Sequence, residues 1–512
     1  MATQTNAGGQ STATIGFEQQ IWKAADILRG NIDASEYKHV ILGLIFLKYI
    51  SDKFDERYLQ LINEGEGFEE EIDEYTAERI FFVPPSSRWN VIAKAAHTPE
   101  IGQVIDDAMR AIEKENKRLK DVLPKTFARP ELDKRRLGDV VDLFTNIKMA
   151  EHGDSKDLLG RTYEYCLARF AEQEGKLAGE FYTPSCVVRT LVEVLRPFNG
   201  RVYDPCCGSG GMFVQSEKFV AERKGKINDI SIYGQESNQT TWRLAKMNLA
   251  IRGIDSSQVK WNNEGSFLND AHKDLKADFV IANPPFNDSD WSGDLIRTDG
   301  RWQFGAPPAG NANYAWIQHF LYHLSPCGIA GFVLAKGSLT SKTSGEGEIR
   351  KALIEARLVD CIVNLPAKLF LNTQIPACLW FLSRNKANGG YRNRTDEILF
   401  IDARNEGHLI NRRTKELSAD DIQKIAETYH EWRKPNSKYE DIKGFCNSAS
   451  IERVKELDYV LTPGRYVGLP DEEDDFNFAE RFGALKAELE VQLNEEARLN
   501  EVIRENLNRI KF

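Results

Sequence analysis

The residues with the clearest chemical potential form the run Asn283-Pro284-Pro285-Phe286, which follows the apolar stretch 277–282. The side-chain oxygen of Asn283 and the main-chain oxygen of Pro284 can each accept a hydrogen bond, and prolines fix the backbone that carries them. An amino group on a flat ring that donates to both loses conjugation with the ring and becomes nucleophilic. Stacking of that ring on Phe286 is worth about 1–3 kcal/mol. The run predicts that such an amine attacks an electrophilic methyl group, in a step driven by positioning and polarisation.

A second pattern, DPCCGSGG at 204–211, follows a short apolar segment and precedes an apolar helical one. Glycine has no Cβ, so its main chain can be approached closely by a ligand. No G-K-[ST] follows, which argues against a P-loop. The full G-x-G-x-x-G is also missing, which argues against a dinucleotide-binding site. The Asp204 carboxylate suits a ligand with an amino group better than one with a pyrophosphate.

Glu236 ends the run YGQE, which is the next predicted strand. A glutamate at a strand end can accept hydrogen bonds from both hydroxyls of a ribose. Together with the glycine turn it predicts a site for a nucleoside without phosphates. The ribose is expected on Glu236 and the amino end near Asp204.

Metal chemistry is not predicted. His319 and His323 have the spacing of two ligands on one helix, but neither an E-x-x pairing nor a set of cysteines accompanies them, and the helix is apolar. The eight cysteines contain no C-x-x-C pair and no disulfide framework. Reduced thiols and a cytoplasmic location are therefore expected.

The middle of the chain, 151–405, is expected to position these residues. Apolar segments alternate there with helical ones, which predicts an α/β domain with a doubly wound, mainly parallel sheet. Ligands of such sheets bind at the carboxyl ends of the strands. The predicted strands are 201–205, 230–236, 259–267, 277–285, 328–339, 359–366 and 377–384.

The flanking regions read as helical. Residues 1–150 are predicted to form an all-α N-terminal domain for partner or DNA contact, and 406–512 a helical C-terminal region. Its last segment, 475–512, repeats apolar residues at helical spacing, which predicts an amphipathic helix that packs on a partner. The long segment 287–313 is rich in glycine and proline and is expected to close over a substrate.

The 512-residue chain has a net charge of −10. That balance is unfavourable for a protein that holds nucleic acid alone, because such affinity rests largely on lysine and arginine. No apolar run is long enough to cross a membrane, and the N-terminus does not resemble a secretory signal. If the substrate is a nucleic acid, a partner protein would have to contribute much of the binding affinity.

The motifs DPCCGSGG, YGQE and NPPF, in this order, resemble those of amino-group methyltransferases that use S-adenosylmethionine, and GEFYTP at 179–184 resembles a further cofactor-contacting segment. Over nearly its whole length the chain resembles the modification subunits of type I restriction–modification systems, which are N6-adenine DNA methyltransferases with a Rossmann-like sheet. The resemblance implies Asn283, Pro284, Pro285 and Phe286 as catalytic residues. It implies these cofactor-binding residues: Glu180, Phe181, Tyr182, Thr183, Pro184, Ser185, Asp204, Cys207, Gly208, Ser209, Gly210, Gly211 and Glu236.

The implied reaction is methyl transfer to N6 of an adenine turned out of DNA. The implied partners are DNA, a specificity subunit, a second modification subunit and an optional endonuclease subunit. Two alternatives stay open: methylation of a protein glutamine amide or an RNA base amine, and a scaffold without activity. The family often has an acidic residue after the third strand; here Ser266, Asn269 and Asp270 are the candidates.

Overall fold

The computed structural model describes residues 21–28, 34–146, 155–174, 183–226, 229–370, 375–387, 390–412, 414–469 and 478–509. Its N-terminal part is helical, as the sequence predicts. The helices are α2 (Ala34–Glu64), α3 (Ile72–Ala77), α4 (Trp89–Lys94), α5 (Ile101–Glu115), α6 (Lys134–Thr145) and α7 (Ser155–Glu174).

Helix α2 is the centre of this part. Its segment 40–47 is almost entirely apolar and buried, as expected for a helix surrounded by others. Gly43 allows a close approach, since a Cβ there would lie 2.5 Å from the ring of Pro124. The same core takes in Leu244, Met247 and Ile251 of α10 (Gln239–Ile251), so the helical part packs directly on the α/β part.

The α/β part is built on one nine-stranded sheet with the order β11-β8-β6-β7-β5-β4-β1-β2-β3. Most neighbours are parallel, whereas β7 runs antiparallel to β5 and β6 and β11 runs antiparallel to β8. The strands are β1 (Gly200–Asp204), β2 (Ile230–Glu236), β3 (Val259–Trp261), β4 (Ala277–Ala282), β5 (Leu324–Ala335), β6 (Val359–Asn364), β7 (Ala377–Ser383), β8 (Glu397–Asp402) and β11 (Cys446–Ser450).

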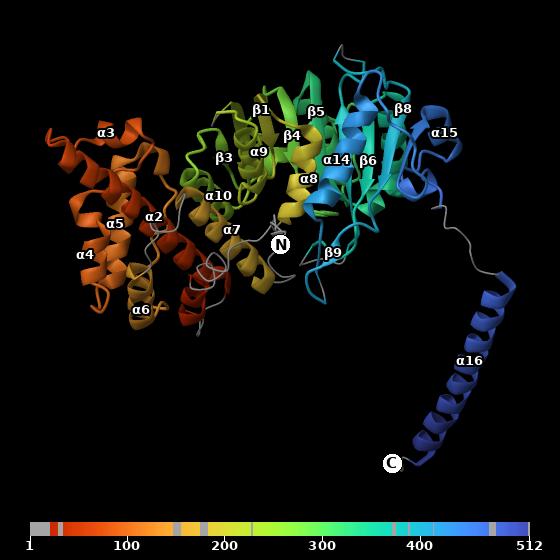
Figure 1. Ribbon diagram of the computed structural model, residues 1–512, viewed down its shortest axis with the longest axis horizontal. Helices are drawn as coiled ribbons and strands as arrows, with labels where there is room; N and C mark the ends of the chain where they lie inside the picture. Colours follow the sequence, from red (N-terminus) through yellow and green to blue (C-terminus); the bar gives the residue numbers. More distant parts are fainter. Residues whose placement is uncertain are drawn as a thin grey trace, which may run out of the picture. The chain divides into compact units, whose positions relative to one another are not determined.

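Helices cover both faces of the sheet, which confirms the doubly wound, Rossmann-like fold (Figure 1). One apolar core joins the sheet to α8 (Ser185–Leu195), α9 (Gly211–Glu222) and α14 (Ala419–Arg433). The other joins it to α12 (Asn313–His323), α13 (Glu346–Glu355) and α15 (Ile451–Glu456). Two separate cores on opposite faces hold the strand ends in fixed positions.

The structure differs from the expected elements in a few places. The segment 259–267 splits into β3 and the short helix α11 (Gly265–Leu268), because Gly265 has a left-handed backbone with φ of 72°. The segment 397–402, for which no strand was predicted, is the buried strand β8. The polar strand β11 adds residues beyond 405 to the sheet, so part of the region expected to be helical belongs to the α/β part.

Two further elements follow β8. A small hairpin, β9 (His408–Leu409) with β10 (Lys415–Glu416), precedes α14. Residues 468–512 form a separate unit that contains α16 (Phe478–Arg509). Within the described part of the chain, no helix combines the length and apolar character that a bilayer crossing requires.

Candidate active site at the carboxyl edge of the sheet

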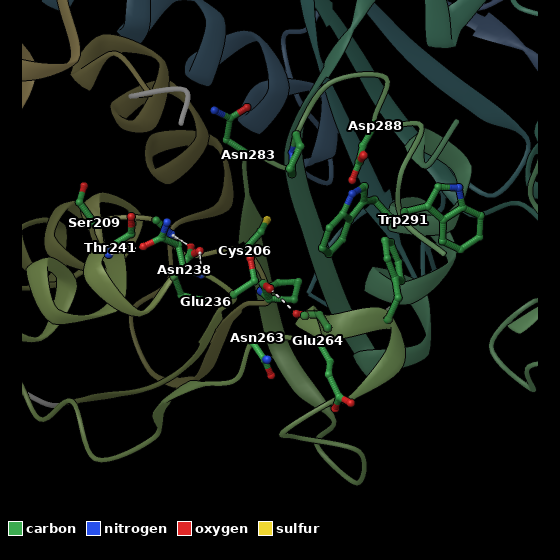
Figure 2. Close-up of a pocket in the computed structure, with 18 of the residues that line it drawn as sticks. Cys206, Ser209, Glu236, Asn238, Thr241, Asn263, Glu264, Asn283, Asp288 and Trp291 are labelled. Atoms are coloured by element: carbon green, nitrogen blue, oxygen red, sulfur yellow. Dashed lines mark hydrogen bonds between the residues drawn. The ribbon is translucent and has the colours of Figure 1, made fainter. Parts of the chain in front are cut away.

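Two cavities adjoin at the carboxyl ends of β1, β2 and β4. The larger has a volume of about 530 Å³ and the smaller about 70 Å³. Both are lined by Cys206, Gly208, Ser209 and Asn283. Figure 2 shows side chains from these strand ends around one space, with Cys206 between Glu236 and Asn283. The parallel pairing of β1 with both β2 and β4 explains why the three motifs meet here.

The glycine turn supplies the wall that the two cavities share. The Cys207 amide donates to Gln235 O of the next strand at 3.0 Å, and the Gly210 amide donates to Cys207 O at 2.8 Å. Gly208 has a φ of 53°, and a Cβ built there would meet no atom within 4 Å. A side chain at this position would therefore occupy space that a ligand can use.

Glu236 is held rigidly by main-chain donors. The Gly208 amide donates to its Oε2 at 3.0 Å, and the Asn238 amide donates to its Oε1 at 2.9 Å. A carboxylate oxygen carries two lone pairs, so each of these oxygens can take part in more than one hydrogen bond. Because Glu236 lines the larger cavity, those acceptors are suited to a pair of adjacent hydroxyls there.

Asp204 is almost completely buried beside the smaller cavity, with 1% of its surface exposed. Burial raises the pKa of its carboxyl group to about 7, although the hydrogen bond from the Cys206 amide at 3.0 Å lowers it in part. A buried carboxylate of this kind is stabilised by any cation that enters the cavity. The site can therefore bind an ammonium group.

Asn283 stands where the two cavities meet. Its Nδ2 donates to Thr183 Oγ1 at 2.8 Å, which fixes the orientation of the amide. Its Oδ1 is buried and accepts no hydrogen bond from the described residues. A buried acceptor without a donor costs about 1–3 kcal/mol, so this atom is set up to accept from a ligand.

Comparison with known proteins identifies the chain. The model of the N-6 DNA methylase family matches residues 154–475, and that of the HsdM N-terminal domain matches residues 17–144. The chain belongs to the N-6 DNA methylase family. It is a DNA methyltransferase, the modification subunit of a type I restriction–modification system.

Its relatives match over most of their length. The type I restriction enzyme HindI methylase subunit of Haemophilus influenzae is 46% identical over 84% of this chain and all of its own. The MjaIX methylase subunit of Methanocaldococcus jannaschii is 40% identical over 97% of this chain and 92% of its own. A crystal structure of the type I methyltransferase subunit from Streptococcus thermophilus superposes with a TM-score of 0.76 at 28% identity, covering 89% of this chain and all of that one.

Most of the expected site residues of this methylase subunit line a cavity: Thr183, Ser185, Asp204, Cys207, Gly208, Ser209, Gly211, Glu236, Asn283 and Pro285. Pro184, Pro284 and Phe286 do not, and neither does Gly210, whose missing Cβ faces Ala245 and Leu249 of α10. Glu180, Phe181 and Tyr182 lie outside the described residues. The individual roles of all these residues stay predictions.

Phe286 is buried and packs against a second ring that the sequence analysis missed. Its ring centroid lies 5.8 Å from that of Phe370, at an interplanar angle of 70°. Phe370 follows β6, whereas Phe286 follows β4, so two strand ends supply the pair. The sequence alone gives no reason to join residues 84 positions apart.

The long segment 287–313 of the methylase is packed against the sheet. Trp291 and Trp302 are both buried, and Trp291 also lines the larger cavity. Arg301 donates to Asp299 at 2.8 Å and to the main-chain oxygen of Ser266 at 3.1 Å. The segment therefore forms one wall of the cavity; its closure over a substrate stays a prediction.

The histidines on α12 have hydrogen-bonding partners. Asp270, His319 and His323 form a buried cluster whose possible ligand atoms all lie within 4.8 Å of one another. His323 Nε2 lies 2.8 Å from Asp270 Oδ2 and its Nδ1 lies 3.0 Å from Leu275 O, while Arg301 donates to His319 Nδ1 at 3.1 Å. Burial raises the pKa of Asp270, but the bond from His323 brings it below its usual range. This bonding, with a guanidinium beside it, favours a structural core over a metal site.

The sequence left three candidates for the cofactor-contacting residue that follows the third strand, and their positions in the structure differ. Of the three candidates, only Ser266 lines the larger cavity, whereas Asp270 is engaged with His323. Lys38, Leu167 and Phe170 from the N-terminal helices also line that cavity, a contribution with no local sequence signal. It arises because the helical part packs on α10.

Proposed function

We propose that this methylase subunit transfers a methyl group from S-adenosylmethionine to the N6 amino group of an adenine turned out of a DNA duplex. The observation that carries the proposal is Asn283 Oδ1, which has no donor among the described residues and lies at the meeting point of the two cavities. A donor bound on the side of Glu236 and Asp204 and a flat amine bound on the side of Phe286 would reach each other at that point. Turning the base out is required because its amine is inaccessible inside a duplex.

The residues present fit S-adenosylmethionine. The larger cavity lies within the range of sites that bind small molecules. Glu236 has acceptors for the ribose hydroxyls, Asp204 has a carboxylate for the amino group, and Gly208 leaves room for the ligand beside the main chain. When bound, this cofactor supplies a methyl group made electrophilic by a positively charged sulfur.

The chain itself positions and polarises the target amine. Asn283 Oδ1 accepts one N–H of the amine, and the main-chain oxygen of Pro284 is the second acceptor that we expect. Thr183 keeps the Asn283 amide from rotating, so the oxygen cannot exchange places with the nitrogen. These acceptors would stabilise the positive charge that develops on the amine nitrogen during methyl transfer.

The aromatic pair Phe286 and Phe370 provides a place for the base. The two rings now contact each other edge to face. If the rings separate, an adenine inserted between them stacks on both sides, each contact worth about 1–3 kcal/mol. Such a slot holds the amine level with Asn283 without reading any sequence.

The test uses the assembled complex with tritiated cofactor and offers DNA, RNA and protein substrates in parallel. We expect label in DNA alone, recovered as N6-methyladenine after digestion. Label in a protein glutamine or an RNA base would overturn the choice of substrate. Absence of both cofactor binding and label would indicate a scaffold.

We further infer that the subunit acts in the cytoplasm with DNA, a specificity subunit, a second copy of itself and an endonuclease subunit. The net charge of −10 supports a complex in which a partner subunit contributes most of the affinity for DNA. Helix α16 offers the means of assembly because its described large apolar side chains are exposed: Phe482, Leu489, Val491, Leu493, Leu499 and Ile503. A chain ending at residue 467 should bind cofactor normally but no longer co-purify with the specificity subunit.

A further inference from the structure

The β9–β10 hairpin lies at the same edge of the sheet as the site, beyond the carboxyl end of β8 (Figure 1). Its tip exposes two adjacent aliphatic side chains, Leu409 at 59% and Ile410 at 53%. The tip is braced, since the Ile410 amide donates to Thr414 O at 3.0 Å and the Thr414 amide donates to Asn411 Oδ1 at 2.8 Å. A braced turn presents these apolar side chains in a fixed direction.

A main-chain bond connects the hairpin to the segment that carries the target-base slot. The Lys415 amide of β10 donates to Lys368 O at 2.9 Å. Lys368 stands two residues before Phe370, whose ring contacts Phe286. The hairpin therefore borders the place where the adenine is expected.

Cations flank the apolar tip. Lys368 and Arg412 are exposed, and neither side chain forms an ion pair with any residue that the structure describes. The nearby Glu406, in contrast, is paired with Lys424 at 2.7 Å. Apolar side chains flanked by free cations match the chemistry of duplex DNA, where aliphatic wedges enter between bases and lysine or arginine contacts the phosphates.

We propose that this hairpin inserts into the duplex beside the target adenine, with Leu409 and Ile410 against the exposed bases and Lys368 and Arg412 on the phosphates. The proposal rests on the proposed function, because it assigns the element that helps to turn the base out. Unstacking and unpairing a base costs a few kcal/mol. Aliphatic side chains that fill the vacated space lower that cost and raise the population of extruded base.

The test compares two duplexes, one with the target adenine paired and one with it opposite an abasic site. In the assembled complex, the Leu409→Ala/Ile410→Ala variant should methylate the paired target at least tenfold more slowly than wild type. On the unpaired target it should remain within threefold, since little extrusion work is left. The matched control is Leu59→Ala/Ile62→Ala, which removes similarly exposed leucine and isoleucine side chains, 59% and 46%, from α2.

Each other outcome overturns the proposal. An equal loss of methylation rate on both duplexes would mean that the hairpin only maintains the shape of the active site. Loss of co-purification with the other subunits would mean that it contacts a protein partner. An unchanged rate would leave the tip without this role. In the Lys368→Gln/Arg412→Gln variant, the slope of log Kd for DNA against log salt concentration should decrease by about 1–2. If wild type methylates neither duplex, the proposed function itself is wrong.

Discussion

The two halves of the site are prepared to different degrees. At the cofactor half, the Glu236 carboxylate accepts two main-chain amides and the glycine turn is tied to β2 by a further bond. At the target half, Asn283 Oδ1 has no donor among the described residues and Phe286 is covered by Phe370. Under the proposed function, the first half is ready for the cofactor, whereas the second would have to open before a base could enter.

This difference fits the demands of the two ligands. A small cofactor binds with affinity when its site is preorganised, because little conformational entropy is lost. A base is offered only after extrusion from DNA, so an open aromatic slot would expose apolar surface to water in the meantime. In the proposed function, the contact between Phe286 and Phe370 would cover that surface until a base replaces it.

Substitution of Asn283 gives the strongest test of the difference between the cofactor half and the target half. The variant Asn283→Ala should reduce methyl transfer by about 100- to 1000-fold, since it removes an acceptor used in the transition state. Its cofactor dissociation constant, measured by calorimetry, should change less than threefold. A matching loss of cofactor affinity would show that Asn283 belongs to the other half.

The cofactor half should respond in the opposite way. In Glu236→Gln one carboxylate oxygen becomes an NH₂ group, which faces a main-chain N–H and cannot accept from the ribose. We expect the cofactor dissociation constant to rise about 10- to 100-fold, as for loss of charged hydrogen bonds. The exposed Glu222→Gln on α9 is the control. Unchanged affinity in Glu236→Gln would refute the ribose assignment.

The aromatic pair should affect DNA alone. Phe370→Leu keeps an apolar side chain but removes one stacking face, so the KM for duplex DNA should rise about tenfold. Cofactor affinity should be unchanged, because Phe370 lines neither cavity. Equal transfer by Phe370→Leu and wild type would mean that the rings stay together during catalysis.

Sequence reasoning located the strand-end motifs because each is short and local. Asn283, Glu236 and Asp204 follow directly from residue type and from the rule that parallel strands end at one edge. Phe370 and Lys38 were missed, since only the packing of distant segments brings them to the site. Strand β11 was missed for a related reason: its sequence is polar, and pairing with β8 alone defines it.

Asp204 predicts a smaller effect, a dependence of cofactor affinity on pH. Its pKa of about 7 means that roughly a tenth of the groups are ionised at pH 6 and three quarters at pH 7.5. If the carboxylate pairs with the cofactor's ammonium, affinity should rise about eightfold over this range. Asp204→Asn should bind more weakly and lose the rise. A flat profile in the wild type would separate Asp204 from the amino group.

The smallest expected effect concerns stability without cofactor. Because the folded-state pKa of Asp204 lies above the unfolded value of 3.8, the carboxyl group stabilises the fold at low pH. That contribution is lost as pH rises through about 7, where ionisation inside the protein becomes a cost. Asp204→Asn removes the titration but keeps an oxygen for the Cys206 amide. Its Tm should exceed that of wild type by about 2–4 °C at pH 8 and by little at pH 4. Asp274→Asn, an exposed change, should show no such dependence. A Tm that falls at pH 8 would mean that the carboxylate already has a cationic partner in the protein.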